Sequence, residues 1–375
     1  GGADSTSGNT LLGYLAGEDI ASGGLNNTLI GHGSAKNIST GDNNVSIGIG
    51  TLSASTDVDR VVAIGNYACG DSALTAGAGD GTGADETTAI GFGALQALTS
   101  GSGNTAIGAF ALDAATDSHF NTAVGHQALS GVTASGVTGN TAVGWNAGIL
   151  ISSGKYNTLL GTVAGDGFDA EEFNTFIGYA SGGGAINGAE KCVALGASTL
   201  GGAATQDGTV AIGYQSLNAL TSGAKNIAIG YDALGDLLEG DSNIAIGYEA
   251  MNAMAGEAGE ANAGDNNIAI GTDAMGSVDA SGHSSARSDN NIAIGKTALK
   301  GGDFSDADKS IENNIAIGTD ALNSSGANEI MDCVAIGYSS LTGVVESTAI
   351  GTVAIGSSAL ASLTSGAENV AIGYQ

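Results

Sequence analysis

Short apolar runs of four or five residues alternate with longer polar stretches along the whole chain. The runs follow the string Asn-(Thr/Ile/Val)-Ala-(Ile/Val)-Gly, as at residues 104–108, 226–230 and 314–318. β-Branched residues alternating over so few positions are typical of strands rather than helices. Gly, Ser, Asn and Asp fill the stretches between the runs, as turns require. The pattern therefore predicts an all-β chain of short strands.

The glycine that closes each run recurs at nearly constant spacing, and we number positions from it as position 0. It occurs 20 times, and ten of the 19 intervals are 17 residues long. This period is too short for a pair of packed helices, and repeats that stack on their neighbours form solenoids. The marker glycines are Gly13, Gly31, Gly48, Gly65, Gly91, Gly108, Gly125, Gly144, Gly161, Gly178, Gly196, Gly213, Gly230, Gly247, Gly271, Gly295, Gly318, Gly337, Gly356 and Gly373.

We predict a parallel β-solenoid of about 20 coils, with one strand of each coil stacked on that of the next. Residues 1–375 form a single repeat array, interpreted as a fragment of a longer chain. Longer insertions near residues 70–86 and 252–312 are expected to be loops. At roughly 4.8 Å per coil, the stack would be a rod about 90 Å long.

The two faces of each predicted strand are both apolar. Position −1 is always Ile, Val or Leu, and we assign it with position −3 to the core. Position −2 points the opposite way and is usually Ala. Where position +4 shrinks to Gly17 or Gly165, position −2 grows to Leu11 or Leu159, so the two positions are predicted to fill one space. Apolar residues on both faces require cover on both, from a second sheet or a neighbouring chain.

Position −4 is Asn in 14 of the 20 copies. Side chains stacked one coil apart can form an amide ladder that satisfies their own polar groups. Cys192 and Cys333 stand at the same position and are predicted to be buried thiols. The clearest members of the predicted ladder are Asn104, Asn121, Asn140, Asn157, Asn174, Asn226, Asn243, Asn267, Asn291 and Asn314.

The string Asn-x-Ala-Ile-Gly-x-x-(Ala/Ser)-Leu resembles the head repeats of YadA-like trimeric autotransporter adhesins. It also resembles the Asn-Thr-Ala-x-Gly-x-x-Ala-Leu repeats of phage tail fibres and tail-fibre-domain proteins. The resemblance covers nearly the whole chain, and it implies parallel β-rolls assembled as a homotrimeric rod. The usual period of 17 residues is longer here than in the adhesin heads.

The charge balance excludes some partners. The chain carries 38 acidic and nine basic residues, for a formal net charge of −29. A nucleic-acid-binding surface needs clustered Lys and Arg, so no nucleic-acid partner is expected. No stretch approaches the roughly 18 apolar residues of a membrane-spanning helix, so this segment is not expected to insert into a membrane.

Candidate chemistry is sparse. The four histidines lie in different coils, and no nucleophile elbow, P-loop or His-Glu-x-x-His string occurs. We therefore expect no catalytic residues and no enzyme activity. No cofactor is expected: Asp303, Asp306 and Asp308 cluster in one insertion, which we interpret as a solvated acidic loop, with calcium binding by these carboxylates as the alternative.

These observations favour a structural fibre or stalk of a virion tail fibre or a cell-surface adhesin. Such a protein would be a rigid, non-catalytic spacer, extracellular, and self-associated as a homo-oligomer, with a trimer implied by the resemblance. The alternative is that the rod itself binds glycans, a surface receptor or calcium through its long acidic loops.

Overall fold

The computed structural model describes residues 7–20, 23–70, 74, 84–184, 188–254, 264–276, 288–301, 310–323, 330–343, 349–363 and 366–375. All regular secondary structure in these residues is β, and every strand pair is parallel. The predicted parallel β-solenoid is therefore confirmed. The chain divides into two compact units, unit 1 at residues 1–180 and unit 2 at residues 181–375.

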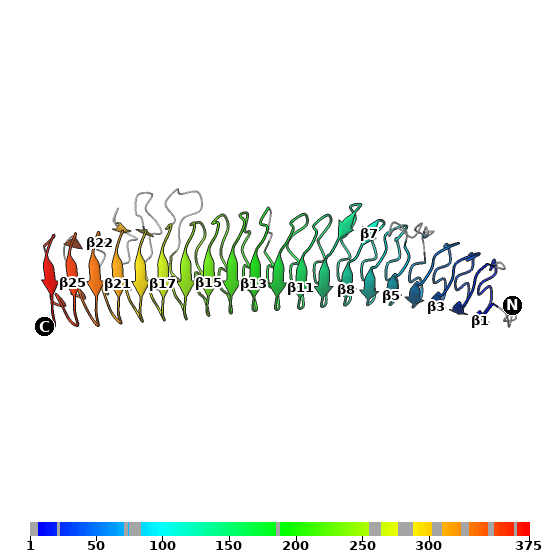
Figure 1. Cartoon of the computed structure of the whole chain (residues 1–375), viewed down its shortest axis with the longest axis horizontal. Coiled ribbons are helices and arrows are strands. Elements are labelled where there is room, and N and C mark those ends of the chain that lie inside the picture. Colours follow the sequence, from blue (N-terminus) through cyan, green and yellow to red (C-terminus); the bar gives the residue numbers. More distant parts are fainter. Residues whose placement is uncertain are drawn as a thin grey trace. The chain divides into compact units, whose positions relative to one another are not determined.

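Unit 1 contains ten main strands of three residues each, and Figure 1 shows them as a row of parallel arrows. Each carries positions −3 to −1 of one repeat. A two-stranded sheet of β7 (Ser118–His119) and β9 (Val137–Thr138) accompanies them. The main strands are β1 (Thr10–Leu12), β2 (Thr28–Ile30), β3 (Val45–Ile47), β4 (Val62–Ile64), β5 (Thr88–Ile90), β6 (Thr105–Ile107), β8 (Thr122–Val124), β10 (Thr141–Val143), β11 (Thr158–Leu160) and β12 (Thr175–Ile177).

Unit 2 repeats this architecture with ten further main strands and a four-stranded second sheet. The second sheet contains β18 (Ser288–Asp289), β20 (Ile311–Glu312), β22 (Ile330–Met331) and β24 (Ala349–Ile350). The main strands are β13 (Val193–Leu195), β14 (Val210–Ile212), β15 (Ile227–Ile229), β16 (Ile244–Ile246), β17 (Ile268–Ile270), β19 (Ile292–Ile294), β21 (Ile315–Ile317), β23 (Val334–Ile336), β25 (Val353–Ile355) and β26 (Val370–Ile372).

The insertions do not disturb the register of the main strands. β4 pairs with β5 across the longest interval, with Val62 opposite Thr88. β16, β17 and β19 likewise pair residue for residue across the two 24-residue intervals. Longer loops are therefore tolerated wherever the strand that follows returns to the same position in the stack. The insertions themselves lie largely outside the described residues.

The assignment of positions −1 and −3 to the core is wrong for the single chain. The middle residue of each main strand, at position −2, points inward, and Ala106, Ala228 and Ala316 are completely buried. Positions −3 and −1 face outward: Ile270 and Ile294 are each 37% exposed. The coil is narrow, so its inner wall accepts mainly Ala, while the bulkier β-branched residues occupy the outer wall. We call positions −3 and −1 the outer columns.

The predicted sharing of space between positions −2 and +4 is borne out inside unit 1. A β-carbon built on Gly17 would lie 2.5 Å from a methyl carbon of Leu11, and one on Gly165 would lie 2.7 Å from Leu159. Gly148 follows the small Ala142, yet its β-carbon would lie 2.8 Å from Leu159 in the next coil. A large side chain at position −2 can therefore fill space left at position +4 of its own coil and of the coil before.

The marker glycine is required by the spacing between coils. Gly108 has a φ of 137°, and a β-carbon on it would lie 2.4 Å from the carbonyl oxygen of Gly125. That atom belongs to the backbone of the next coil, so it cannot rotate away. The same close approach recurs from Gly125 to Gly144 and onward, which explains why this position is always glycine.

Replacing the marker glycine should therefore be far more damaging than replacing a glycine elsewhere. We expect Gly108→Ala to lower the free energy of unfolding by more than about 4 kcal/mol, because backbone must shift in two coils. Gly136 is the matched control: it also has a positive φ, but nothing lies within 4 Å of its β-carbon position. Gly136→Ala should cost only about 1–2 kcal/mol. Equal losses in denaturant unfolding would contradict this account of the repeat.

Candidate functional surfaces and side-chain columns

The Asn side chains at position −4 form hydrogen-bonded columns inside the solenoid. In unit 1 the amide oxygen of Asn104 accepts the backbone N–H of Asn121 at 3.0 Å, and the Asn121 oxygen accepts that of Asn140 at 2.9 Å. The amide nitrogens donate to backbone carbonyls of the next coil, as Asn140 does to Gly154 at 2.8 Å. Asn157 and Asn174 continue the column. Each side chain thus supports the turn that precedes the next strand.

Unit 2 contains the same arrangement. Asn243 donates its backbone N–H to the Asn226 oxygen at 2.9 Å, and its side-chain nitrogen reaches the Gly264 carbonyl at 2.8 Å. The column then continues through Asn267, Asn291 and Asn314 to the backbone N–H of Cys333. These residues are completely buried, so the hydrogen bonds replace water for every amide.

The column weakens where threonine replaces asparagine. The hydroxyl oxygens of Thr87, Thr209 and Thr352 are buried and have no hydrogen-bond partner. A shorter side chain at position −4 does not reach the backbone groups that the amide satisfies. A buried polar group without a partner costs about 1–3 kcal/mol. These positions are therefore local weak points in a repetitive fold.

Restoring the amide should strengthen unit 2. In Thr209→Asn the new oxygen can accept the backbone N–H of Asn226, as Asn226 does for Asn243, so we expect a gain of about 1–2 kcal/mol in the free energy of unfolding. Asn243→Thr should lower the free energy of unfolding by a comparable amount. Thr205→Asn, at an exposed position outside the strands, should change the free energy of unfolding by less than about 0.5 kcal/mol. A destabilised Thr209→Asn chain in thermal or chemical denaturation would refute the role given to the column.

The three cysteines are free and buried, which confirms the prediction for Cys192 and Cys333. Cys192 approaches the Glu190 carbonyl at 3.4 Å, and Cys333 approaches the Met331 carbonyl at the same distance. Burial raises the pKa of the Cys69 thiol to about 12. Because the thiolate is the reactive form, these side chains are poor nucleophiles at neutral pH.

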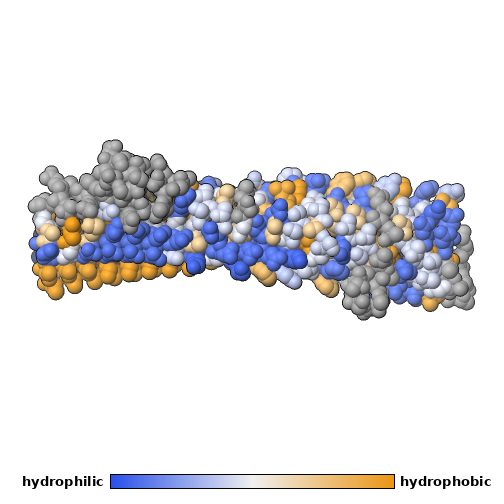
Figure 2. Space-filling view, turned by 90° about the horizontal axis from the view of Figure 1, so that it is seen from above, coloured by the Kyte–Doolittle hydropathy of each residue, from blue (hydrophilic) through white to orange (hydrophobic). Residues whose placement is uncertain are grey.

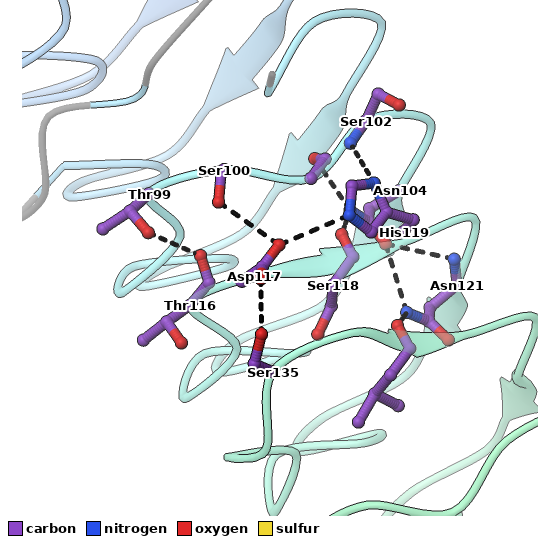
Figure 3. A network of polar contacts seen from close by, with 12 residues as sticks. Thr99, Ser100, Ser102, Asn104, Thr116, Asp117, Ser118, His119, Asn121 and Ser135 are labelled. Carbon is purple, nitrogen blue, oxygen red and sulfur yellow. Dashed lines mark hydrogen bonds and ion pairs between the residues drawn. The ribbon is translucent and has the colours of Figure 1, made fainter. Parts of the chain in front are cut away.

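A polar network on the loop side of unit 1, which the sequence reasoning missed, joins an aspartate, a histidine and several serines (Figure 3). Asp117 accepts hydrogen bonds from Ser135 at 2.5 Å and from Ser100 at 3.3 Å. Its carboxylate also lies 3.3 Å from Nε2 of His119. The second imidazole nitrogen, Nδ1, accepts the backbone N–H of Ser102 at 3.2 Å. The network links three consecutive coils.

This arrangement contains Ser, His and Asp but is not assembled as a catalytic triad. A triad needs one imidazole nitrogen on the carboxylate and the other on a nucleophilic hydroxyl. Here His119 uses its second nitrogen to hold backbone, and the serine hydroxyls bond to Asp117 instead. The geometry is therefore that of a clamp between coils. Ser100 and Asp117 are separated by the repeat length of 17 residues, as are Ser102 and His119, so the period is the signal that could have found these contacts.

Two aspartates of unit 1 have opposite electrostatic environments. Burial raises the pKa of Asp113, one oxygen of which has no hydrogen-bond partner. The hydroxyl of Ser135 is the main cause that lowers the pKa of Asp117, with smaller contributions from Ser100 and His119. A raised pKa disfavours the ionised carboxylate in the fold, whereas a lowered pKa favours it.

The two amide substitutions should therefore have effects of opposite sign. Asp113→Asn should raise stability at neutral pH, and this gain should vanish as acid protonates the aspartate in both states. Asp117→Asn should lower stability at neutral pH, because the ionised form stabilises the fold above the ordinary aspartate pKa. The stability lost in Asp117→Asn should become smaller as the pH falls through the lowered pKa of Asp117. Unfolding midpoints measured between neutral and strongly acidic pH test both, and effects of the same sign would contradict the assignment.

The outward face of the main strands differs in composition between the two units. In unit 2 all 20 outer-column residues are Val, Ile or Leu, and Figure 2 shows an orange band along one side of this unit. In unit 1 the same columns mix residue types: Thr105 and Thr122 stand at position −3, and Ile107 at position −1 is 37% exposed. Contiguous exposed apolar surface is characteristic of interaction sites in proteins.

The calcium candidates Asp303, Asp306 and Asp308 lie outside the described residues. Among the residues that the structure does describe, no group of three or more His, Cys, Asp and Glu side chains is placed to hold a metal ion. The search for a long apolar helix that could cross a bilayer, confined to the same residues, also finds none.

Comparison with known proteins adds no identification. No protein-family model matches the chain, and the search of curated proteins gives no match.

Proposed function

We propose that the chain is a structural fibre or stalk, part of a virion tail fibre or a cell-surface adhesin, that self-associates through its outer columns. The observation that carries the proposal is the half-exposed row of Ile and Val side chains along the main strands of unit 2. A parallel sheet with apolar residues on both faces requires cover on both. A second and third copy of the same chain, assembled as a homotrimer, would supply that cover.

The composition supports association through this face rather than indiscriminate aggregation. The outer columns in unit 2 hold no charged residue, whereas the chain as a whole carries a net charge of −29. Repulsion between acidic surfaces keeps finished rods apart, while the uncharged strip remains able to pack. Each main strand also pairs with its neighbours in the stack over its whole length. A second copy that packs against the outer columns would therefore contact side chains rather than unpaired backbone groups.

The protein, in this proposal, is a spacer outside the cell or on a virion that does no chemistry of its own. Hydrogen bonds that run from coil to coil resist stretching and bending along the stack. Figure 1 shows this stacking within each unit. The columns of buried Asn and the Asp117 clamp add side-chain links to the same contacts.

Charged residues in the outer columns should break the assembly. We expect the intact chain to be an oligomer in native mass spectrometry and sedimentation, and Ile292→Lys with Ile294→Lys in β19 to shift it to monomers. The loss follows from desolvating two ammonium groups against an apolar partner, which costs several kcal/mol for each ion.

Asn290→Lys is the control for charge without placement in the outer columns, because it adds one ammonium group to the same coil at an exposed position. Lys191 and Lys225 already occupy the equivalent position in other coils. The control should remain oligomeric. A monodisperse monomer for the unmodified chain would overturn the proposed self-association.

A further inference from the structure

Three tyrosines in unit 2 form a continuous stack across successive coils. Tyr214, Tyr231 and Tyr248 each follow a marker glycine, at position +1. The rings of Tyr214 and Tyr231 have centroids 5.4 Å apart at an interplanar angle of 21°, and those of Tyr231 and Tyr248 lie 5.1 Å apart at 11°. Among the residues that the structure describes, these are the only pairs in which tyrosine stacks on tyrosine.

The spacing of the rings is imposed by the backbone. The N–H of Asp232 donates to the Tyr214 carbonyl at 2.9 Å, and the N–H of Glu249 donates to the Tyr231 carbonyl at the same distance. The next coil repeats the contact, from Asp273 to Tyr248 at 3.0 Å. Each ring is thus attached at the point where one coil is hydrogen-bonded to the next, and the pairs remain adjacent without any cost of bringing them together.

The stack is open to small reagents and lies beside a proton acceptor. The three tyrosines are 47%, 44% and 50% exposed. The Glu249 carboxylate accepts a hydrogen bond from Tyr248, which together with its charge raises the pKa of that phenol. A phenol loses its proton when it loses an electron, so a carboxylate in this position can take the proton as the ring is oxidised.

We propose that Tyr214, Tyr231 and Tyr248 are an oxidative cross-linking site, at which a one-electron oxidant joins neighbouring coils through dityrosine. Two adjacent phenols each lose one electron and the hydroxyl proton, giving two tyrosyl radicals. A carbon–carbon bond then forms between Cε atoms of the two rings. The hydrogens on those carbons move to the oxygens, which restores both phenols. Hydrogen peroxide acting through a haem peroxidase accepts the two electrons and two protons and is reduced to water.

The product would be a covalent link between consecutive coils of unit 2. The link closes a loop of about one repeat and therefore restricts the unfolded chain in the way a disulfide does. Separation of neighbouring coils, which otherwise breaks only hydrogen bonds and packing, would require a covalent bond to break. This inference concerns single chains and does not depend on the proposed self-association.

The test is oxidation of the whole chain with a haem peroxidase and hydrogen peroxide at low protein concentration, followed by tryptic digestion. Lys225 separates Tyr214 from Tyr231, and the next basic residue is Arg287. We expect a cross-linked species in which peptides 192–225 and 226–287 are joined with the loss of two hydrogen atoms. Dityrosine fluorescence should rise in the band of the single chain.

Tyr231→Phe keeps a ring in the stack but removes the phenol shared by both pairs, so the joined peptides and most of the fluorescence should be lost. Tyr338→Phe removes an exposed tyrosine that, among the residues that the structure describes, stacks on no other tyrosine, so it should leave the yield unchanged. Oxidation of the unfolded chain in denaturant should abolish the preference for links between the stacked tyrosines. Cross-links that form mainly between separate chains, or that survive Tyr231→Phe at the same yield, would overturn the assignment.

Discussion

The close stacking of one coil on the next is the constraint on which this structure depends. At the marker glycine the carbonyl oxygen of the following coil occupies the space of a β-carbon, as between Gly108 and Gly125. Every main strand is three residues long, which would be far too short for an isolated sheet. Stability must therefore come from repetition, because each coil satisfies the backbone groups of its neighbours. A fold of this kind tolerates variation in loops and almost none in the contact between coils.

The same stacking converts a side chain repeated along the sequence into a column. The buried Asn residues, the Tyr214 stack and the outer columns all arise because equivalent positions lie one coil apart. What each column does depends on its chemistry and on the direction it faces. Amides inside the coil bond to backbone, apolar residues outside it remain half-exposed, and aromatic rings at the turn pack on one another. The side chains that these columns bring together thus form lines of residues along the stack.

The sequence predicted the strands well because the period, the glycine and the short β-branched runs all point to one backbone path. Position −4 is occupied so regularly by Asn that its inward placement could be expected as well. Which face of each strand points into the coil could not be predicted in the same way, because Ala at position −2 and Ile at position −1 are both apolar. Hydrophobicity favoured Ile as the core residue, whereas the narrow coil admits a side chain larger than Ala at position −2 mainly where position +4 is small. Volume, rather than hydropathy, decides which face is inside.

The contacts that sequence reasoning missed share a physical cause. Asp117 and Ser135 lie in adjacent coils, 18 residues apart, so they meet only when those coils have stacked. The tyrosine stack did carry a signal, because Tyr214, Tyr231 and Tyr248 are each separated by the repeat length of 17 residues. When a residue type recurs with the period of a solenoid, its copies in adjacent coils lie in contact with one another, whatever their role. Reading such chains by position within the repeat, one column at a time, therefore identifies contacts that a search for linear motifs overlooks.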